Sequence, residues 1–186
     1  MKKIFLFIAI LFLLSKTFAQ VSYYKYEWTQ INNKTKFSGI IKLKIKDTLL
    51  TGEIIWKFEA IDDANATAIQ YYKGQKNKMG IEYVKGFFYA KTNDIRFEGI
   101  IKYDPYLIIG MDKYLLKLSA DKLIIYGRTL SNGENNGPVY FYKKDNLRGE
   151  EEFEMLKSKI FLKTGDKAMR LSTPENSTFF IYAAAT

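Results

Sequence analysis

Phe37-Ser-Gly-Ile-Ile-Lys-Leu-Lys-Ile45 is a stretch in which every second residue is apolar or glycine. Because the side chains of a β-strand alternate between its two faces, this period of two predicts a strand with one dry face. The next stretch, Leu50-Thr-Gly-Glu-Ile-Ile-Trp-Lys-Phe58, repeats the alternation after Lys46-Asp47, a pair typical of a tight turn. Together the two stretches predict an antiparallel hairpin whose apolar faces turn toward a common core.

The same pattern extends along the chain in both directions. Tyr24, Tyr26 and Trp28 alternate with polar residues, and the stretch from Ile95 to Tyr103 is another clear case. Eight consecutive strands with mostly short connections predict an all-β fold, an eight-stranded antiparallel up-and-down (meander) barrel with a C-terminal extension. The weaker strand patterns of this set lie at 80–90, 107–118, 122–129 and 138–144.

Glycine recurs in the middle of the predicted strands. Gly39, Gly52 and Gly99 lie on the apolar face, and Phe37-Ser-Gly-Ile-Ile-Lys42 closely repeats as Phe97-Glu-Gly-Ile-Ile-Lys102. Glycine weakens a strand, so its repetition has a cause. Two interpretations stay open: the glycines let the strands coil sharply around a small barrel, or they hollow out a ligand cavity.

Two regions depart from the alternation. The long connection 59–78 has the length of a lid or a binding loop, and Ala64–Tyr72 within it fits either a helical turn or a short strand. In the C-terminal extension, Arg148–Ser158 predicts a short helix. Further strands are predicted there at Lys159–Lys163 and Thr178–Ala183.

The N-terminus has the pattern of an export signal. Lys2 and Lys3 precede a short apolar run, and small residues lead up to Ala19. We expect cleavage after Ala19 and localisation in the periplasm or the extracellular medium. The chain has no cysteine, so its core holds together without disulfides. The expected organisation is a signal peptide at 1–19, a barrel domain at 20–145 and an extension at 146–186.

The chain is basic, with a formal net charge of +9 that falls to +6 when Lys2, Lys3 and Lys16 leave with the signal. The remaining lysines are spread along strand faces and form no cluster with interleaved aromatic residues. This distribution favours a role in solubility. We expect no nucleic-acid partner and no stable membrane insertion after cleavage.

One segment carries a resemblance. Gly80-Ile-Glu-Tyr-Val-Lys-Gly86, with Gly99, Asp104-Pro105 and Ile109-Gly-Met-Asp-Lys-Tyr114, resembles secreted Bacteroidota proteins that have no established activity. The short Lys-Lys leader ending in Ala-Gln is common in the same group. The plan of strands resembles the avidin and lipocalin barrels in architecture alone. The Gly-x-Trp opening of the lipocalins is absent, so no binding residue is carried over.

Histidine and cysteine are both absent, which excludes Ser-His-Asp and Cys-His catalysis and the commonest zinc sites. The parity of Glu53 and Glu98 places them on the solvent face, where they fit an exposed ladder with lysines better than a catalytic pair. The acidic residues around Asp62-Asp63 and Asp104 lack the spacing of a calcium site. We therefore expect no catalytic residues, no metal and no cofactor.

Asp112 shares its parity with the apolar Tyr114 and Leu116. A carboxylate on the inner face is buried and needs a partner, for which Lys85 and Arg128 are candidates. Such a pair serves either as a structural link across the barrel or as the polar floor of a ligand pocket. The candidate ligand-binding residues are Tyr83, Lys85, Tyr103, Asp112, Tyr114 and Arg128.

These observations favour a non-catalytic binding module that holds a small or apolar ligand, or a glycan, in or at the mouth of the barrel. The alternative is a structural or protein-interaction domain with a filled barrel, whose protein partner the sequence does not identify. An outer-membrane barrel and a glycan-active enzyme fit less well, because the apolar side chains face inward and no catalytic set is present.

Overall fold

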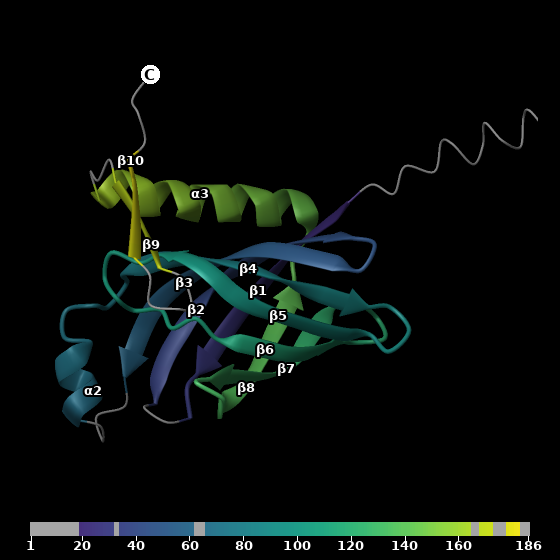
Figure 1. The fold of residues 1–186 in the computed structure, drawn as a ribbon, viewed down its shortest axis with the longest axis horizontal. Coiled ribbons are helices and arrows are strands. Elements are labelled where there is room, and N and C mark those ends of the chain that lie inside the picture. The colour runs from purple at the N-terminus through teal and green to yellow at the C-terminus, as the bar shows by residue number, and fades with distance from the viewer. Residues whose placement is uncertain (1–18, 32–33, 62–65, 165–167, 173–177, 183–186) are drawn as a thin grey trace, which may run out of the picture.

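The computed structural model describes residues 19–31, 34–61, 66–164, 168–172 and 178–182. Within these ranges, eight consecutive antiparallel strands close into a barrel, and the first strand pairs with the eighth (Figure 1). This arrangement confirms the predicted up-and-down barrel. The strands are β1 (Gln20–Thr29), β2 (Thr35–Lys46), β3 (Leu49–Ile61), β4 (Met79–Tyr89), β5 (Asp94–Tyr103), β6 (Lys113–Leu118), β7 (Ile124–Ser131) and β8 (Glu134–Lys143).

The first three strands face the core as their alternation predicts. Tyr26 of β1, Ile41 of β2 and Ile54 of β3 are buried inside the barrel. Across the strands, Tyr26 lies opposite Gly39, and Gly39 lies opposite Trp56. Two aromatic side chains therefore flank the glycine, which fits tight coiling of a small barrel around bulky inner residues.

The inner face of β4 is the opposite of the expected one. Glu82 and Val84 are buried inside the barrel, whereas Tyr83 and Lys85 lie on the outer face. The pattern misleads because Ile81 on the outer face is also fully buried. A strand that is covered on both faces loses the clean alternation from which a face is assigned.

A β-bulge changes the inner face of β5. Tyr83 pairs with Ile101, but the next residue, Val84, pairs with Gly99, so β5 carries one extra residue. Beyond such a bulge the side chains exchange faces. Lys102 therefore shares the face of the inward Glu82, its cross-strand partner, and Tyr103, which we expected inside, belongs to the cluster on the outer face.

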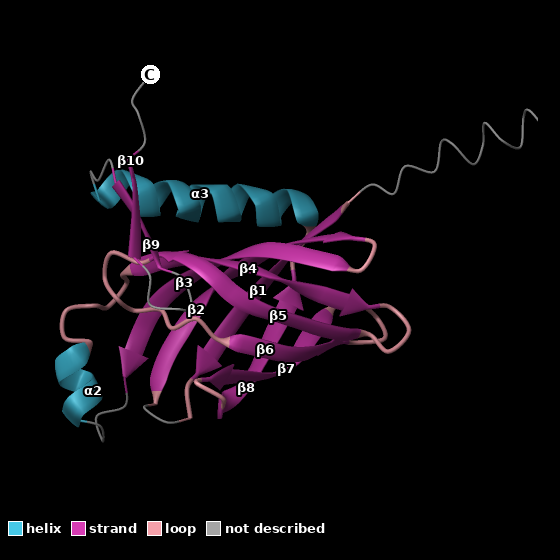
Figure 2. Ribbon diagram, viewed as in Figure 1, coloured by secondary structure: helices cyan, strands magenta, loops and turns pink. Residues whose placement is uncertain are grey.

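An α-helix, α3 (Asn146–Thr164), lies across the outside of the barrel (Figure 2). Asp145 Oδ1 accepts a hydrogen bond from the Arg148 amide at 3.2 Å and caps the helix start. Phe153 and Ile160, two turns apart, are buried on the face of the helix that meets the barrel. Their outward-facing partners on the strands are Tyr23, Ile40, Ile55, Ile81 and Tyr103.

The C-terminal predictions have mixed outcomes. The helix at Arg148–Ser158 is confirmed, but the strand at Lys159–Lys163 is wrong, because Ile160 continues the apolar stripe of α3. The strand pattern at Thr178–Ala183 is confirmed by β10 (Thr178–Tyr182), with Ala183 outside the described residues. β10 pairs with β9 (Ala168–Ser172), which was not predicted.

The barrel end near α2 (Ala66–Tyr71) carries the two longest connections. The connection 59–78 is shorter than expected, because β3 continues to Ile61, and α2 confirms the helical alternative for part of Ala64–Tyr72. The other connection, 104–112, includes the first part of the strand predicted at 107–118, and the prediction is wrong for residues 107–112, because β6 begins only at Lys113. Instead, Asp104 accepts hydrogen bonds from the Ile108 amide at 3.0 Å and the Ile109 amide at 2.7 Å, which replaces strand pairing there.

The barrel interior is filled by side chains. Twenty buried residues form one cluster that includes Trp28, Trp56, Phe97, Tyr114 and Phe141. The void beside Trp28, Trp56 and the 104–112 connection measures about 10 Å³, room for about one water molecule. The glycines on the inner face therefore make room for large neighbouring side chains and do not open a ligand-sized space at this end of the barrel.

Candidate functional site

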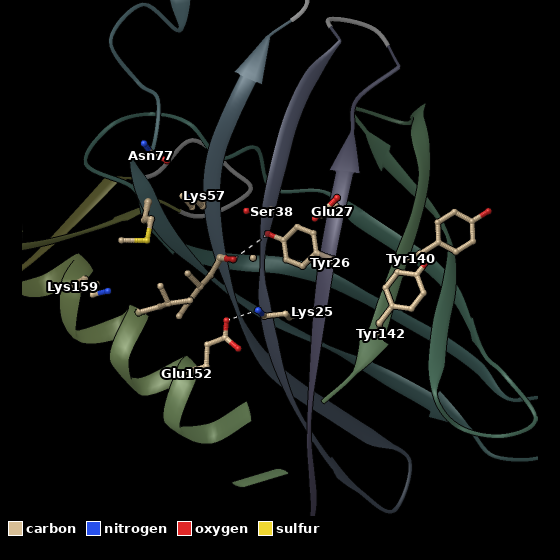
Figure 3. A pocket seen from close by; sticks show the side chains of 14 residues that line it. Lys25, Tyr26, Glu27, Ser38, Lys57, Asn77, Tyr140, Tyr142, Glu152 and Lys159 are labelled. Carbon is tan, nitrogen blue, oxygen red and sulfur yellow. Dashed lines mark hydrogen bonds and ion pairs between the residues drawn. The ribbon is translucent and has the colours of Figure 1, made fainter. Parts of the chain in front are cut away.

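A groove of about 960 Å³ lies between α3 and the outer face of the barrel (Figure 3). Strands β8, β1, β2 and β3 supply one side of it and α3 supplies the other. We call it the α3 groove. Its lining residues are Lys25, Tyr26, Glu27, Ser38, Gly39, Ile55, Lys57, Asn77, Met79, Tyr140, Tyr142, Glu152, Leu156 and Lys159.

The floor of the α3 groove lies at Gly39. A Cβ on this residue would stand 1.9 Å from the Ile55 carbonyl oxygen and 2.8 Å from the Tyr26 hydroxyl. The absence of a side chain lets the Tyr26 hydroxyl pass beneath the strand and donate to the Ile55 carbonyl at 3.1 Å (Figure 3). Gly39 therefore allows the close approach of β2 to Tyr26 of β1 and Ile55 of β3 beneath the groove.

An ion pair joins the helix wall to the barrel. Lys25 Nζ lies 2.7 Å from Glu152 of α3 (Figure 3). Lys144 Nζ lies 3.4 Å from the same carboxylate. Partial burial acts to raise the pKa of Glu152, but the hydrogen bonds and charges of the two lysines outweigh it, so the pKa is lowered. Glu152 is thus an anion at neutral pH, and it fixes the position of α3 on this side.

Two tyrosines form the opposite side of the groove. Tyr140 and Tyr142 of β8 are 47% and 52% exposed, because they alternate with the inward-facing Val139 and Phe141. They lie opposite Glu27 and Lys25 of β1 in the strand pairing. Each ring therefore offers an apolar face to the groove beside a charged neighbour.

The end of the groove near Asn77 is polar. Lys57 lies 2.9 Å from Glu59, and the Ser38 hydroxyl also donates to Glu59. Burial raises the pKa of Glu59, and the bonds from Ser38 and Lys57 lower it more strongly, so the net shift is downward. The groove therefore combines apolar faces, hydroxyl groups and largely compensated charges. Such a surface suits the binding of a ligand.

A second polar cluster lies inside the barrel around Glu82, which is fully buried. Its Oε2 atom accepts hydrogen bonds from Trp56 Nε1 at 2.9 Å and from the Tyr114 hydroxyl at 3.0 Å. Burial raises the pKa of Glu82 to about 8; hydrogen bonds from Trp56 and Tyr114 oppose this rise, and the charge of Asp112 adds to it. Glu82 is therefore largely an uncharged acid at neutral pH.

Asp112 is buried, as its parity predicts, with 4% of its surface exposed. Its partner is not Lys85 or Arg128, since both are exposed on the outer face. Asn136 of β8 donates from Nδ2 to Asp112 Oδ2 at 3.2 Å instead. Burial raises the pKa of Asp112, and this hydrogen bond opposes the rise.

The structure separates the six predicted ligand-binding residues. Tyr114 and Asp112 lie inside the barrel close to Glu82, and Tyr83 and Tyr103 pack beneath α3. Sequence reasoning missed Glu82 as an inner residue. Its shared parity with the apolar Val84 was the available signal. The α3 groove had no such signal, because it depends on segments more than a hundred residues apart.

Comparison with protein-family models, curated proteins and solved structures finds no match to this chain. The resemblance to secreted Bacteroidota proteins therefore has no further support. The likeness to avidins and lipocalins is limited to the eight-stranded barrel architecture. Across the described ranges, no three or more Asp or Glu residues gather in a way that would hold a metal ion. None of the helices in those ranges has the length and apolar character needed to cross a membrane.

Proposed function

We propose that the protein is an exported, non-catalytic binding domain whose ligand lies in the α3 groove, on the outside of a filled barrel. The observation that carries this proposal is the difference in volume between two hollows. The groove measures about 960 Å³, whereas the void beside Trp28 and Trp56 inside the barrel measures about 10 Å³. Ligand sites commonly have volumes of roughly 300–1,000 Å³.

The lining of the groove supports a small hydroxylated molecule or a short glycan as the ligand. Tyr140 and Tyr142 offer exposed ring faces, on which an apolar face of a ligand can lie. Ser38, Asn77 and Lys57 supply donors and acceptors at the other end. Because Lys25 and Lys57 are already paired with carboxylates, a neutral ligand fits better than a strongly charged one.

Export is part of the proposal. Strand β1 begins at Gln20, the residue that follows the expected cleavage site, so removal of residues 1–19 leaves the barrel strands intact. Cleaved protein would then be found in the periplasm or the medium.

The experiment is a nuclear magnetic resonance titration of the exported protein with neutral hexasaccharides of glucose, xylose and N-acetylglucosamine, and with laurate. We expect at least one hexasaccharide to shift the amide signals of Ser38 and Gly39. The double variant Tyr140→Ala/Tyr142→Ala abolishes these shifts, and the matched control Tyr89→Ala, exposed on β4, retains them. The proposal fails if laurate shifts Val84 and Val139 inside the barrel, or if no probe acts on the groove.

A protein-interaction role is the second candidate, and one observation favours it. A mostly apolar hollow of about 490 Å³ lies over the outer face of β3 to β6, where Leu49 and Phe87 are 59% and 47% exposed. Exposed apolar surface of this kind occurs at protein interfaces. Cross-linking in the producing cell distinguishes the two: a partner lost with Phe87→Lys but kept with Tyr140→Ala supports this second role.

A further inference from the structure

Buried polar atoms without hydrogen-bond partners gather inside the barrel. Among the described residues, they include Trp28 Nε1, Glu82 Oε1 and Thr129 Oγ1. All three side chains are at least nine-tenths buried. Buried polar atoms are nearly always paired in folded proteins, and a bound water or ion is one explanation for an exception. These atoms belong to side chains buried inside the barrel, so a polar occupant of the interior would find partners there.

The walls around this space are aromatic. Trp28, Phe37 and Trp56 line the small void together with Asp112. The ring centroids of Trp28 and Trp56 are 5.6 Å apart, and those of Phe37 and Trp56 are 5.5 Å apart. Trp56 also holds the Glu82 carboxyl group. Aromatic faces beside carboxyl groups are the surroundings that attract a cation carrying alkyl groups.

The lysine whose charge acts on Glu82 is engaged elsewhere. Lys102 shares the face of Glu82 and lowers its pKa by its charge. Its ammonium group, however, lies 3.4 Å from Asp104 and donates to the Ile109 carbonyl at the barrel end. The inner carboxyl groups are thus without an ammonium partner in direct contact among the described residues.

The 104–112 connection covers the space. Ile108 and Ile109 insert their side chains into the core, whereas the preceding residue, Leu107, is 52% exposed. Side-chain hydrogen bonds hold the connection: Asp104 accepts from the Ile108 and Ile109 amides, and Tyr71, the last residue of α2, donates to the Leu107 carbonyl at 3.0 Å. Residues 105–111 pair with no strand, whereas the Asp112 carbonyl accepts a hydrogen bond from the Gly99 amide of β5 at 3.1 Å. The part of the cover that precedes Asp112 can therefore lift without opening the barrel ladder.

We propose that the 104–112 connection is a lid over an internal site for a small organic cation of the alkylated ammonium class, which on lid opening replaces Ile108 and Ile109 against Trp28 and Trp56. This site is separate from the α3 groove and does not depend on it. In the closed state, the void of about 10 Å³ has room for about one water molecule.

The test is a fluorescence titration of the exported protein with choline chloride. The chain has two tryptophans, and both line the site, so their emission reports on it. The matched uncharged probe is 3,3-dimethylbutan-1-ol, which has the same shape without the charge, and sodium chloride controls for ionic strength. We expect choline to change the emission and the uncharged probe to bind at least about tenfold more weakly, because the ring faces attract the charge.

Variants extend the test. Asp112→Asn lowers choline affinity, and Ile109→Ala, which shortens the plug, raises it. Affinity also rises as the pH increases through about 8, because Glu82 must lose its proton to neutralise the ligand. The titratable groups that interact with Glu82 inside the barrel are Asp112, Lys102, Tyr26 and Tyr114. Equal binding of both probes, or unchanged emission with wild type and Ile109→Ala alike, overturns the proposal and leaves internal water as the occupant.

Discussion

Glu82 Oε1 occupies the space that a side chain on Gly99 would need: a Cβ there would stand 2.1 Å from that oxygen. The two residues lie on neighbouring strands, β4 and β5, and both face the barrel interior. The glycine at this position thus leaves the space that the buried carboxyl group of Glu82 needs. This contact links the strand pattern read from the sequence to the polar cluster of the core.

Replacement of Gly99 tests this link. We expect Gly99→Ala to destabilise the protein by about 1–3 kcal/mol, the usual cost of overpacking a filled core. The matched control is Gly110→Ala, because a Cβ at 110 would lie 3.4 Å from Asp112 Oδ1, an ordinary contact. Urea unfolding measures both. Equal stability of the two variants would show that Glu82 does not rely on the glycine.

The raised pKa of Glu82 predicts how stability depends on pH. The folded-state pKa is about 8 and the ordinary value is 4.5, so between these pH values the native state holds a proton that the unfolded chain releases. Stability therefore falls as pH rises through this window, by at most roughly 1.4 kcal/mol per pH unit from this group. Below pH 4.5 and above pH 8 Glu82 adds no slope.

The isosteric variant Glu82→Gln isolates this effect. The amide cannot ionise, so the variant loses the slope between pH 5 and 8 and gains stability over wild type as pH rises. Unfolding in urea at pH 5, 6.5 and 8 measures the difference. Parallel curves for wild type and variant would mean that Glu82 titrates as an ordinary carboxylate.

The docking of α3 depends on Phe153, which is fully buried against the outer face of the barrel. We expect Phe153→Ala to cost about 3–5 kcal/mol, as for other buried phenylalanines. Met155→Ala is the control, since Met155 is 47% exposed on the same helix and should change stability little. Thermal unfolding followed by circular dichroism compares them. A similar loss for both would contradict the observed helix face.

Asp104 should control the opening of the 104–112 connection. Asp104→Ala removes two hydrogen bonds to a carboxylate, each worth about 1.5–3 kcal/mol, so hydrogen exchange at the Ile108 and Ile109 amides should accelerate at least about tenfold. Asp121→Ala is the control, because Asp121 holds the exposed turn at Leu123 instead. Unchanged exchange at 108 and 109 would show that the connection is held by its isoleucines alone.

The sequence was sufficient where a strand has one dry face. On β1, β2 and β3 the period of two assigned the inner residues correctly, and Asp112 was found because it shares parity with Tyr114. The period of two assigned the wrong inner residues on β4, where α3 also buries the outer face. It did so again on β5, where a bulge exchanges the two faces. Tyr83, Lys85 and Tyr103 were assigned to the interior for that reason.

The rest of the candidate site had no local signal. The α3 groove joins Tyr140 of β8, Gly39 of β2 and Glu152 of α3, and such proximity follows from barrel closure and helix docking. The length of α3 also depends on a tertiary contact, since Ile160 is helical where it can reach Tyr103 and its neighbours. Local alternation at Lys159–Lys163 fits a strand equally well.

Crystals of the exported protein soaked with a library of small neutral fragments give the most direct test of a filled barrel with an external binding groove. Fragments should collect above Gly39, between Leu156 of α3 and the ring of Tyr140. Neutral fragments bound instead between Trp56 and Phe141, inside the closed barrel, would contradict the account.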